Sequence, residues 1–323
     1  MGPNARPRLL VSRCLGFAAC RYDGAILREP FLEELSRFTD VVTVCPEVEI
    51  GLGVPRSPVR LVASDQGPRL VQPESGRDVT SQMDAFAKAF LDSLGLCDGA
   101  VLKAESPSCG LRSVRLYASA ERGSAHTKAV GAFGGRALVT RPTWAVEDEG
   151  RLENFDLRQH FLTRLFAAAR LRAVAASGRM ADLVDFHARH KLLLMVYHQT
   201  EMRAMGRLVA DGARRPFAEV TADYARSMAR ALDRPPRRTS AINALEHAFG
   251  YVSDRMTPRE RTFFLATLSD YRAGRIPLAA PVRLAQALIV RFDVGYLANQ
   301  VLFHPFPDEL AEVLDSGKGK PLR

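Results

Sequence analysis

Two stretches decide the fold of this chain: residues 8–14 read RLLVSRC, and residues 40–45 read DVVTVC. Each is a short apolar run with β-branched residues, and each ends in a cysteine. The intervening segment Phe31–Leu35 has the apolar spacing of a helix. A strand, a helix and a second strand in this order are typical of a parallel α/β sheet.

The same alternation continues outward through the first half of the chain. A helix is predicted from the capping residues Asp78–Ser81 to Leu94, and helical spacing returns after Phe155. Two runs, 59–62 and 69–71, flank a turn at 65–67 and predict a hairpin outside the main sheet. Gly99–Lys103 is expected to be the third strand of the sheet, and Arg136–Thr140 the fourth.

Beyond Gly178 nearly every segment has helical periodicity, punctuated by prolines. One long helix is expected to carry Phe186, His190, Leu193, Tyr197 and Leu208 on a single face. The prediction is therefore an α/β N-terminal domain with a mainly parallel sheet, residues 1–176, followed by an all-α helical C-terminal domain, residues 177–323.

The composition is that of an ordinary globular protein, with 47% hydrophobic and 25% charged residues among 323. No apolar run approaches the length needed to cross a bilayer, so no membrane partner is expected. The first eight residues lack the apolar core of a secretory signal, which predicts a cytoplasmic protein.

The net charge of +9 is carried mainly by scattered arginines. From Ser177 onward there are 22 Lys or Arg residues against 16 Asp or Glu, a surplus of six. A basic helical domain suggests RNA as a partner, although no basic stripe with interleaved aromatic residues accompanies the charge.

Three of the five cysteines directly follow predicted strands or the loops that leave them: Cys14, Cys45 and Cys109. Open α/β sheets bind ligands outside the carboxyl ends of their strands, so these thiols are expected to meet. Cys20 lies in the loop after Cys14, whereas Cys97 precedes a strand and is interpreted as a core residue.

Thiols contributed one per loop suit an iron–sulfur cluster, which bridges wider gaps than a single ion. No Cys-x-x-Cys pair is present, which disfavours a zinc knuckle and a dithiol redox motif. Three ligands would leave one iron open as a Lewis acid. The alternative, that the three thiols are small core residues, stays open on spacing alone.

Polar residues beside the cysteines add candidates for chemistry. Glu47 follows Cys45 by two residues, and a carboxylate near a partly dry site can serve as general acid or base. Ser106 and Ser108 place hydroxyl groups in the turn that carries Cys109. For any single glutamate, however, a solvated surface position is the commoner case.

Several motifs in order resemble the 2-thiouracil desulfidase family over residues 8–165 or so. They are CLG at 14–16 with CRYDG at 20–24, CPEV at 45–48 with GLGVPR at 51–56, GRDVT at 76–80, and SPSCG at 106–110. The second half resembles the all-helical domain often fused behind that family, with FHARHK at 186–191 and HPFP at 304–307.

This resemblance implies a [4Fe–4S] cluster on Cys14, Cys45 and Cys109, with one iron not bound by a protein cysteine. The thiocarbonyl sulfur of a small thiolated nucleobase such as 2-thiouracil would meet that iron. Glu47 would be the acid/base group, and Ser106 would help to hold the substrate. Uracil and sulfide would leave without net electron transfer, and Cys20 would have a supporting or redox role.

Rival interpretations belong to other classes of protein. In one, the cluster is structural or redox-sensing, and the basic helical half of an adaptor binds RNA or a protein. In another, the thiols hold zinc for a hydrolase. His187 and His190 lie three residues apart in the predicted long helix and could share an ion, but helix-face histidines are more often packing residues.

Overall fold

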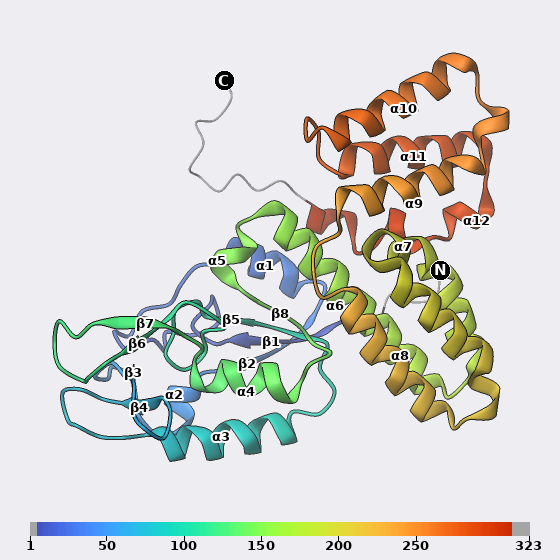
Figure 1. Cartoon of the computed structure of the whole chain (residues 1–323). Helices are drawn as coiled ribbons and strands as arrows, with labels where there is room; N and C mark the ends of the chain where they lie inside the picture. The colour runs from blue at the N-terminus through green and yellow to red at the C-terminus, as the bar shows by residue number, and fades with distance from the viewer. Residues whose placement is uncertain (1–4, 312–323) are drawn as a thin grey trace. The chain divides into compact units, whose positions relative to one another are not determined.

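The computed structural model of the chain describes residues 5–311. The chain forms two compact units, of which the first runs to Ala169 and the second covers Arg170–Asp308 (Figure 1). The division falls inside the helix α6 (Phe155–Ser177), which confirms the helical segment predicted after Phe155.

The first unit is built on a four-stranded parallel sheet with the strand order β2-β1-β5-β8. Its strands are β1 (Arg8–Ser12), β2 (Asp40–Val44), β5 (Gly99–Leu102) and β8 (Ala145–Asp148). The first three confirm the strands predicted from their apolar runs. Because all four strands run in one direction, their carboxyl ends lie along a single edge.

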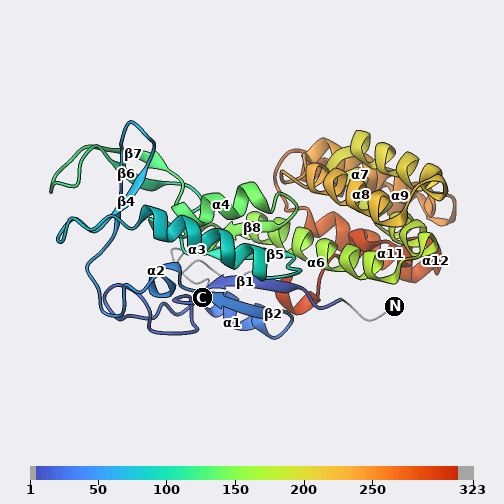
Figure 2. The same cartoon turned by 90° about the horizontal axis from the view of Figure 1, so that it is seen from below.

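Helices cover both faces of this sheet, which explains why its central strands are apolar on both sides. The helix α1 (Pro30–Ser36) and α6 lie on one face, and α3 (Thr80–Ser93) and α4 (Ala132–Thr140) lie on the other (Figures 1 and 2). Gly99 permits the close approach of β8 and α6, because a Cβ atom there would lie 2.4 Å from the Ala145 carbonyl oxygen and 2.9 Å from the Leu165 side chain.

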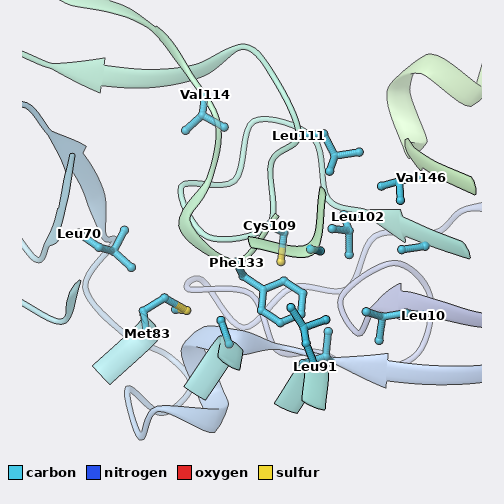
Figure 3. Close-up of a cluster of buried hydrophobic side chains, with 14 of the residues drawn as sticks. Leu10, Leu70, Met83, Leu91, Leu102, Cys109, Leu111, Val114, Phe133 and Val146 are labelled. Carbon is cyan, nitrogen blue, oxygen red and sulfur yellow. The ribbon is translucent and has the colours of Figure 1, made fainter. Parts of the chain in front are cut away.

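The core between the sheet and α3–α4 is a cluster of fully buried side chains. Leu10 and Leu102 reach it from the strands, and Met83 and Leu91 reach it from α3. Figure 3 shows that Phe133 of α4 lies in the same cluster, next to the thiol-bearing side chain of Cys109. The candidate site is therefore anchored directly on the hydrophobic core.

A second sheet has the order β4-β3-β6-β7. Its strands are β3 (Arg60–Val62), β4 (Arg69–Val71), β6 (Val114–Tyr117) and β7 (His126–Ala129). The antiparallel β3–β4 pair confirms the predicted hairpin outside the main sheet. The strands β6 and β7 were not predicted, since His126–Ala129 is largely exposed and has no apolar pattern.

The predicted strand Arg136–Thr140 is wrong, because this segment lies within the helix α4. Phe133 and Ala137 are both completely buried, and their spacing of four is helical. Val139, which made the segment look like a strand, is 81% exposed. The fourth strand of the sheet is β8, whose four residues are all buried.

The second unit consists of helices, and the described residues after Asp148 form no strand. Its α-helices are α7 (Met180–Asp211), α8 (Phe217–Ala231), α9 (Arg238–Gly250), α10 (Pro258–Arg272), α11 (Ala279–Phe292) and α12 (Gly295–Ala298). Short 3₁₀ turns follow at Gly212–Arg214, Ser253–Arg255 and Val301–Phe303. The helix α7 packs against α8 and α9, and α9, α10 and α11 pack against one another.

The long helix α7 buries Phe186, His190 and Leu193 as its periodicity predicts, but it is interrupted at His198, whose φ and ψ are −158° and 93°. His190 stacks on Phe186 and His187 contacts Tyr224, so both histidines are packing residues. Within residues 5–311, no helix is both long and apolar enough to pass through a bilayer.

Candidate active site

A cavity of about 300 Å³ opens at the carboxyl edge of the parallel sheet. The segments that follow β1, β2 and β5 each contribute one thiol to it: Cys14, Cys45 and Cys109, respectively. All three side chains are at most 9% exposed, and no cysteine of the described chain forms a disulfide. The structure thus brings together three thiols that are far apart in sequence.

Local backbone structure holds each thiol-bearing turn. Cys14 lies in a turn closed by the hydrogen bond from Leu15 N to Ser12 O at 2.9 Å. Cys45 is the residue that precedes the short helix α2 (Pro46–Glu49), which begins with Pro46. Proline suits the first position of a helix, so the chain leaves β2 and turns at once.

The Cys109 turn depends on close contact with α4. Gly134 of α4 lies so near that a Cβ atom there would be 2.4 Å from the Cys109 carbonyl oxygen. The hydroxyl of Ser106 accepts backbone N–H groups of Ser108 at 3.2 Å and of Cys109 at 3.1 Å. Ser106 therefore caps the turn and lines the cavity at the same time.

The fourth cavity cysteine is Cys20, which lies in the loop between β1 and α1. Its carbonyl oxygen accepts a hydrogen bond from the Cys45 thiol at 3.6 Å. Cys97 lies outside the cavity, where its thiol contacts the carbonyl oxygens of Arg8 at 3.1 Å and Gly99 at 3.3 Å. The cysteines therefore divide into four that line the cavity and one that packs elsewhere.

Burial sets the protonation of the cavity thiols. Desolvation raises the pKa of Cys14 to about 11, assisted by the neighbouring Cys45 and opposed by Lys103. Burial likewise raises the pKa of Cys109 well above its ordinary value, although a hydrogen bond from Ser12 opposes this shift. The free thiols of Cys14 and Cys109 stay protonated at neutral pH, so a bound metal would have to displace their protons.

Glu47 is a buried carboxylate at the wall of the cavity rather than a surface residue. Its Oε1 accepts a hydrogen bond from the Ser108 hydroxyl at 2.9 Å, and its Oε2 forms an ion pair with Arg56 at 2.8 Å. Sequence spacing places Glu47 near Cys45, but its burial and its two partners could be seen only in three dimensions.

Two charged groups of the cavity wall were not predicted. Lys103 directly follows β5 and pairs with Glu149, which also accepts the Ala104 N–H group at 2.7 Å. Its position at a strand end could have indicated it. Arg56 stands in the quoted GLGVPR motif, but no spacing rule identifies an arginine as buried, and the exposed fraction of its side chain is 4%.

The donors are not gathered around one point. Among residues 5–311, no three Cys, His, Asp or Glu side chains lie close enough together to hold one metal ion. The cavity is also large for a single ion. Thiol donors spread around such a space fit a larger, sulfur-containing group better than a zinc ion.

Comparisons with known proteins relate the two parts of the chain to different families. Residues 9–149 match the model of a family described as 2-thiouracil desulfurase, and residues 191–307 match one described as a protein of unknown function, DUF1722. The chain is 28% identical over 158 residues to the uncharacterized protein YbgA of Escherichia coli K12, covering 48% of this chain and 92% of YbgA.

Two further proteins resemble this chain. The uncharacterized protein YbbK of Bacillus subtilis 168 is 34% identical over 109 residues, which are 32% of this chain and 72% of YbbK. A solved structure, the [4Fe-4S]-dependent thiouracil desulfidase TudS, is 30% identical with a TM-score of 0.36, covering 45% of this chain and 93% of that one. From the match over residues 9–149 and the identity and coverage of its relatives, this chain belongs to the 2-thiouracil desulfurase family.

Proposed function

We propose that the chain is a [4Fe–4S]-dependent desulfidase that removes sulfur from a thiolated pyrimidine such as 2-thiouracil. Cys14, Cys45 and Cys109 would hold the cluster and leave one iron without a protein cysteine. The balanced reaction takes the thiocarbonyl compound and water to uracil and hydrogen sulfide, so it consumes no electrons. Family membership supports the desulfidase activity, while the cluster and the substrate are the proposal.

One observation carries the proposal: three thiols from the segments that follow three strands line a single cavity that also contains a carboxylate and a hydroxyl. The soft donors fit iron and sulfide, and their spread around about 300 Å³ leaves space for both a cluster and a small substrate. When bound, the open iron would supply a Lewis acid toward the thiocarbonyl sulfur.

The remaining chemistry is assigned to side chains of the cavity wall. Glu47 would accept a proton from the attacking water, because its carboxylate faces the cavity while Ser108 and Arg56 hold its two oxygens. Ser106 would orient the substrate. Its oxygen already accepts two backbone N–H groups, so its own hydrogen is available to donate into the cavity.

Metal analysis and product analysis together test the proposal. Protein purified without oxygen is expected to contain about four iron and four sulfide ions per chain, as the proposed cubane requires. It should convert 2-thiouracil to uracil and release sulfide. Colourless protein that contains zinc, or protein without iron after anaerobic reconstitution, would show that the proposal is wrong.

A pair of cysteine variants tests the ligand assignment. Cys109→Ala removes a buried cavity thiol, so the variant is expected to lose or degrade the cluster. Its visible absorption band should decrease accordingly. Cys97→Ala is the matched control, because Cys97 packs outside the cavity. An unchanged spectrum in Cys109→Ala would remove Cys109 from the ligand set.

A further inference from the structure

Arg56 is a buried cation in the wall of the cavity. Its side chain is 4% exposed, and Glu47, with which it pairs, is 11% exposed. Its backbone N–H also donates to Tyr22 O at 2.8 Å, so both ends of the residue are held. A guanidinium group in such a position must have its donors satisfied, because burial of an unpaired charge is costly.

The guanidinium group joins three segments of the chain through all of its N–H donors. Nε and Nη2 donate to Glu47 Oε2, at 2.9 and 2.8 Å, respectively. Nη1 donates to the carbonyl oxygens of Cys20 at 3.0 Å and Gly53 at 2.9 Å. Nη2 also reaches the Cys45 thiol at 3.9 Å. A guanidinium has five N–H donors, and these five contacts use the set.

This arrangement requires arginine in particular. A lysine has three donors on one tetrahedral nitrogen, so it cannot give two hydrogen bonds to a carboxylate oxygen and also reach two carbonyl groups and a thiol. The contacts also connect residues with different expected tasks, namely the carboxylate of Glu47, a proposed ligand in Cys45, and the loop of Cys20. Arg56 thus touches the acid/base group and the cluster-binding region at once.

We infer that Arg56 is a positioning residue of the desulfidase site, which fixes the Glu47 carboxylate relative to Cys45 and donates a hydrogen bond toward the Cys45 sulfur. This inference rests on the proposed function. It assigns Arg56 two separable effects: orientation of the general base, and withdrawal of charge from a ligand sulfur. Hydrogen bonds to ligand sulfurs raise the reduction potential of iron–sulfur clusters.

Three variants of the cluster-loaded full chain test the inference. Arg56→Gln removes the charge. Arg56→Lys keeps the charge but removes the planar guanidinium group with its several N–H donors. Arg13→Gln is the matched control, since Arg13 pairs at 2.6 Å with Glu49 of the same helix α2 but does not line the cavity. Turnover of 2-thiouracil, iron content and reduction potential are measured for each.

Both Arg56 variants are expected to lower kcat about 10- to 100-fold while KM changes by less than about threefold, because the base is misplaced and the cavity keeps its shape. Arg56→Gln is also expected to lower the reduction potential, and Arg13→Gln should leave kcat, KM and potential unchanged. An Arg56→Lys enzyme with normal kcat, or an Arg56→Gln cluster with a normal potential, overturns the inference.

Unfolding of the cluster-free chain separates this inference from the proposed function. Arg56→Gln and Glu47→Gln each leave a buried partner without its ion pair, so each should lower the urea midpoint. The double variant should lose much less than the sum of the two losses. If the decreases in urea midpoint are additive, Arg56 and Glu47 do not pair, whether or not the wild-type protein turns over 2-thiouracil. If the decreases are not additive but the wild-type protein shows no turnover, only the proposed function is rejected.

Discussion

At the scale of single residues, Glu47 combines burial with the ability to accept a proton. Glu47→Gln keeps the shape of the side chain but removes this ability. Turnover is expected to fall by roughly 10²–10⁴-fold, as when a general base is lost. The absorption spectrum should stay intact because the thiols are untouched. Steady-state assays of the loaded protein measure the effect.

Glu49→Gln provides the control for this change. Glu49 lies on the same short helix and pairs with Arg13, but it does not line the cavity. Its loss is expected to leave turnover unaltered. Normal turnover in Glu47→Gln would exclude this carboxylate from the proton transfer.

The thiol of Cys14 predicts how the stability of the cluster-free protein depends on pH. Its pKa in the folded protein is about 11, against an ordinary value of 9.0. The unfolded chain therefore loses this proton first, and the folded state becomes less stable as pH rises from about 9 to about 11. A shift of this size corresponds to about 2–3 kcal/mol.

Urea unfolding of the cluster-free protein at pH 8 and pH 10.5 measures this dependence. Cys14→Ala should unfold with a smaller loss between the two pH values, because it no longer contributes a buried titrating thiol. Equal losses in the wild type and the variant would show that Cys14 does not carry the effect.

At the scale of secondary-structure elements, α4 supports the Cys109 turn through a glycine. A Cβ atom at Gly134 would lie 2.4 Å from the Cys109 carbonyl oxygen, a backbone atom that cannot move without moving the turn. Gly134→Ala is therefore expected to destabilise the protein by about 1–3 kcal/mol and to reduce iron retention. Thermal unfolding and iron analysis measure the two effects.

The neighbouring glycine offers a matched control. A Cβ atom at Gly135 would meet only the Val130 side chain, at 3.3 Å, and alanine is the better helix former. Gly135→Ala should leave iron retention unchanged. If both variants retained iron equally, contact with α4 would not be what positions Cys109.

The sequence correctly predicts the elements whose apolar residues are buried. It fails where an apolar residue is exposed to solvent. The runs at Arg8–Ser12 and Asp40–Val44 are strands that pair with each other, the first in the middle of the sheet and the second at its edge. Residues 136–140 were wrongly predicted as a strand, because β-branched Val139 favours a strand but lies on the solvent-exposed side of a helix. Cysteine positions after strands predict one cavity, whereas the contacts of Arg56 depend on loop conformations that no local pattern specifies.

At the scale of the whole molecule, the surplus of positive charge in the helical half suggests RNA as a partner, and the comparisons with known proteins give RNA binding no support. Some arginines of this half contact carboxylates: Asp223 pairs with both Arg215 and Arg226, and Glu201 pairs with Arg230. Arg237 and Arg238, at the start of α9, have no ion pair within residues 5–311. If the prediction holds, such arginines would make the contacts with phosphate groups.

Filter binding of a structured RNA at a series of salt concentrations tests this prediction. Affinity should fall linearly on a logarithmic plot, and the double variant Arg237→Gln/Arg238→Gln should reduce the magnitude of the slope by about 1–2. Arg215→Gln, whose charge is matched by Asp223 at 2.6 Å, should change it less. Failure to bind RNA at low salt would reject RNA as a partner. Turnover of free 2-thiouracil, in contrast, should not fall steeply with salt concentration.

The three thiols proposed to bind the cluster lie far apart along the chain, at positions 14, 45 and 109. A group bound to all three would act as a covalent cross-link with three arms, closing two long loops of the polypeptide. Such a link reduces the entropy of the unfolded chain, as a disulfide does, by an amount that grows with loop length. Loss of the cluster would then remove the cross-link that stabilises the domain as well as the activity. The rate of proteolysis would therefore show whether the cluster is bound.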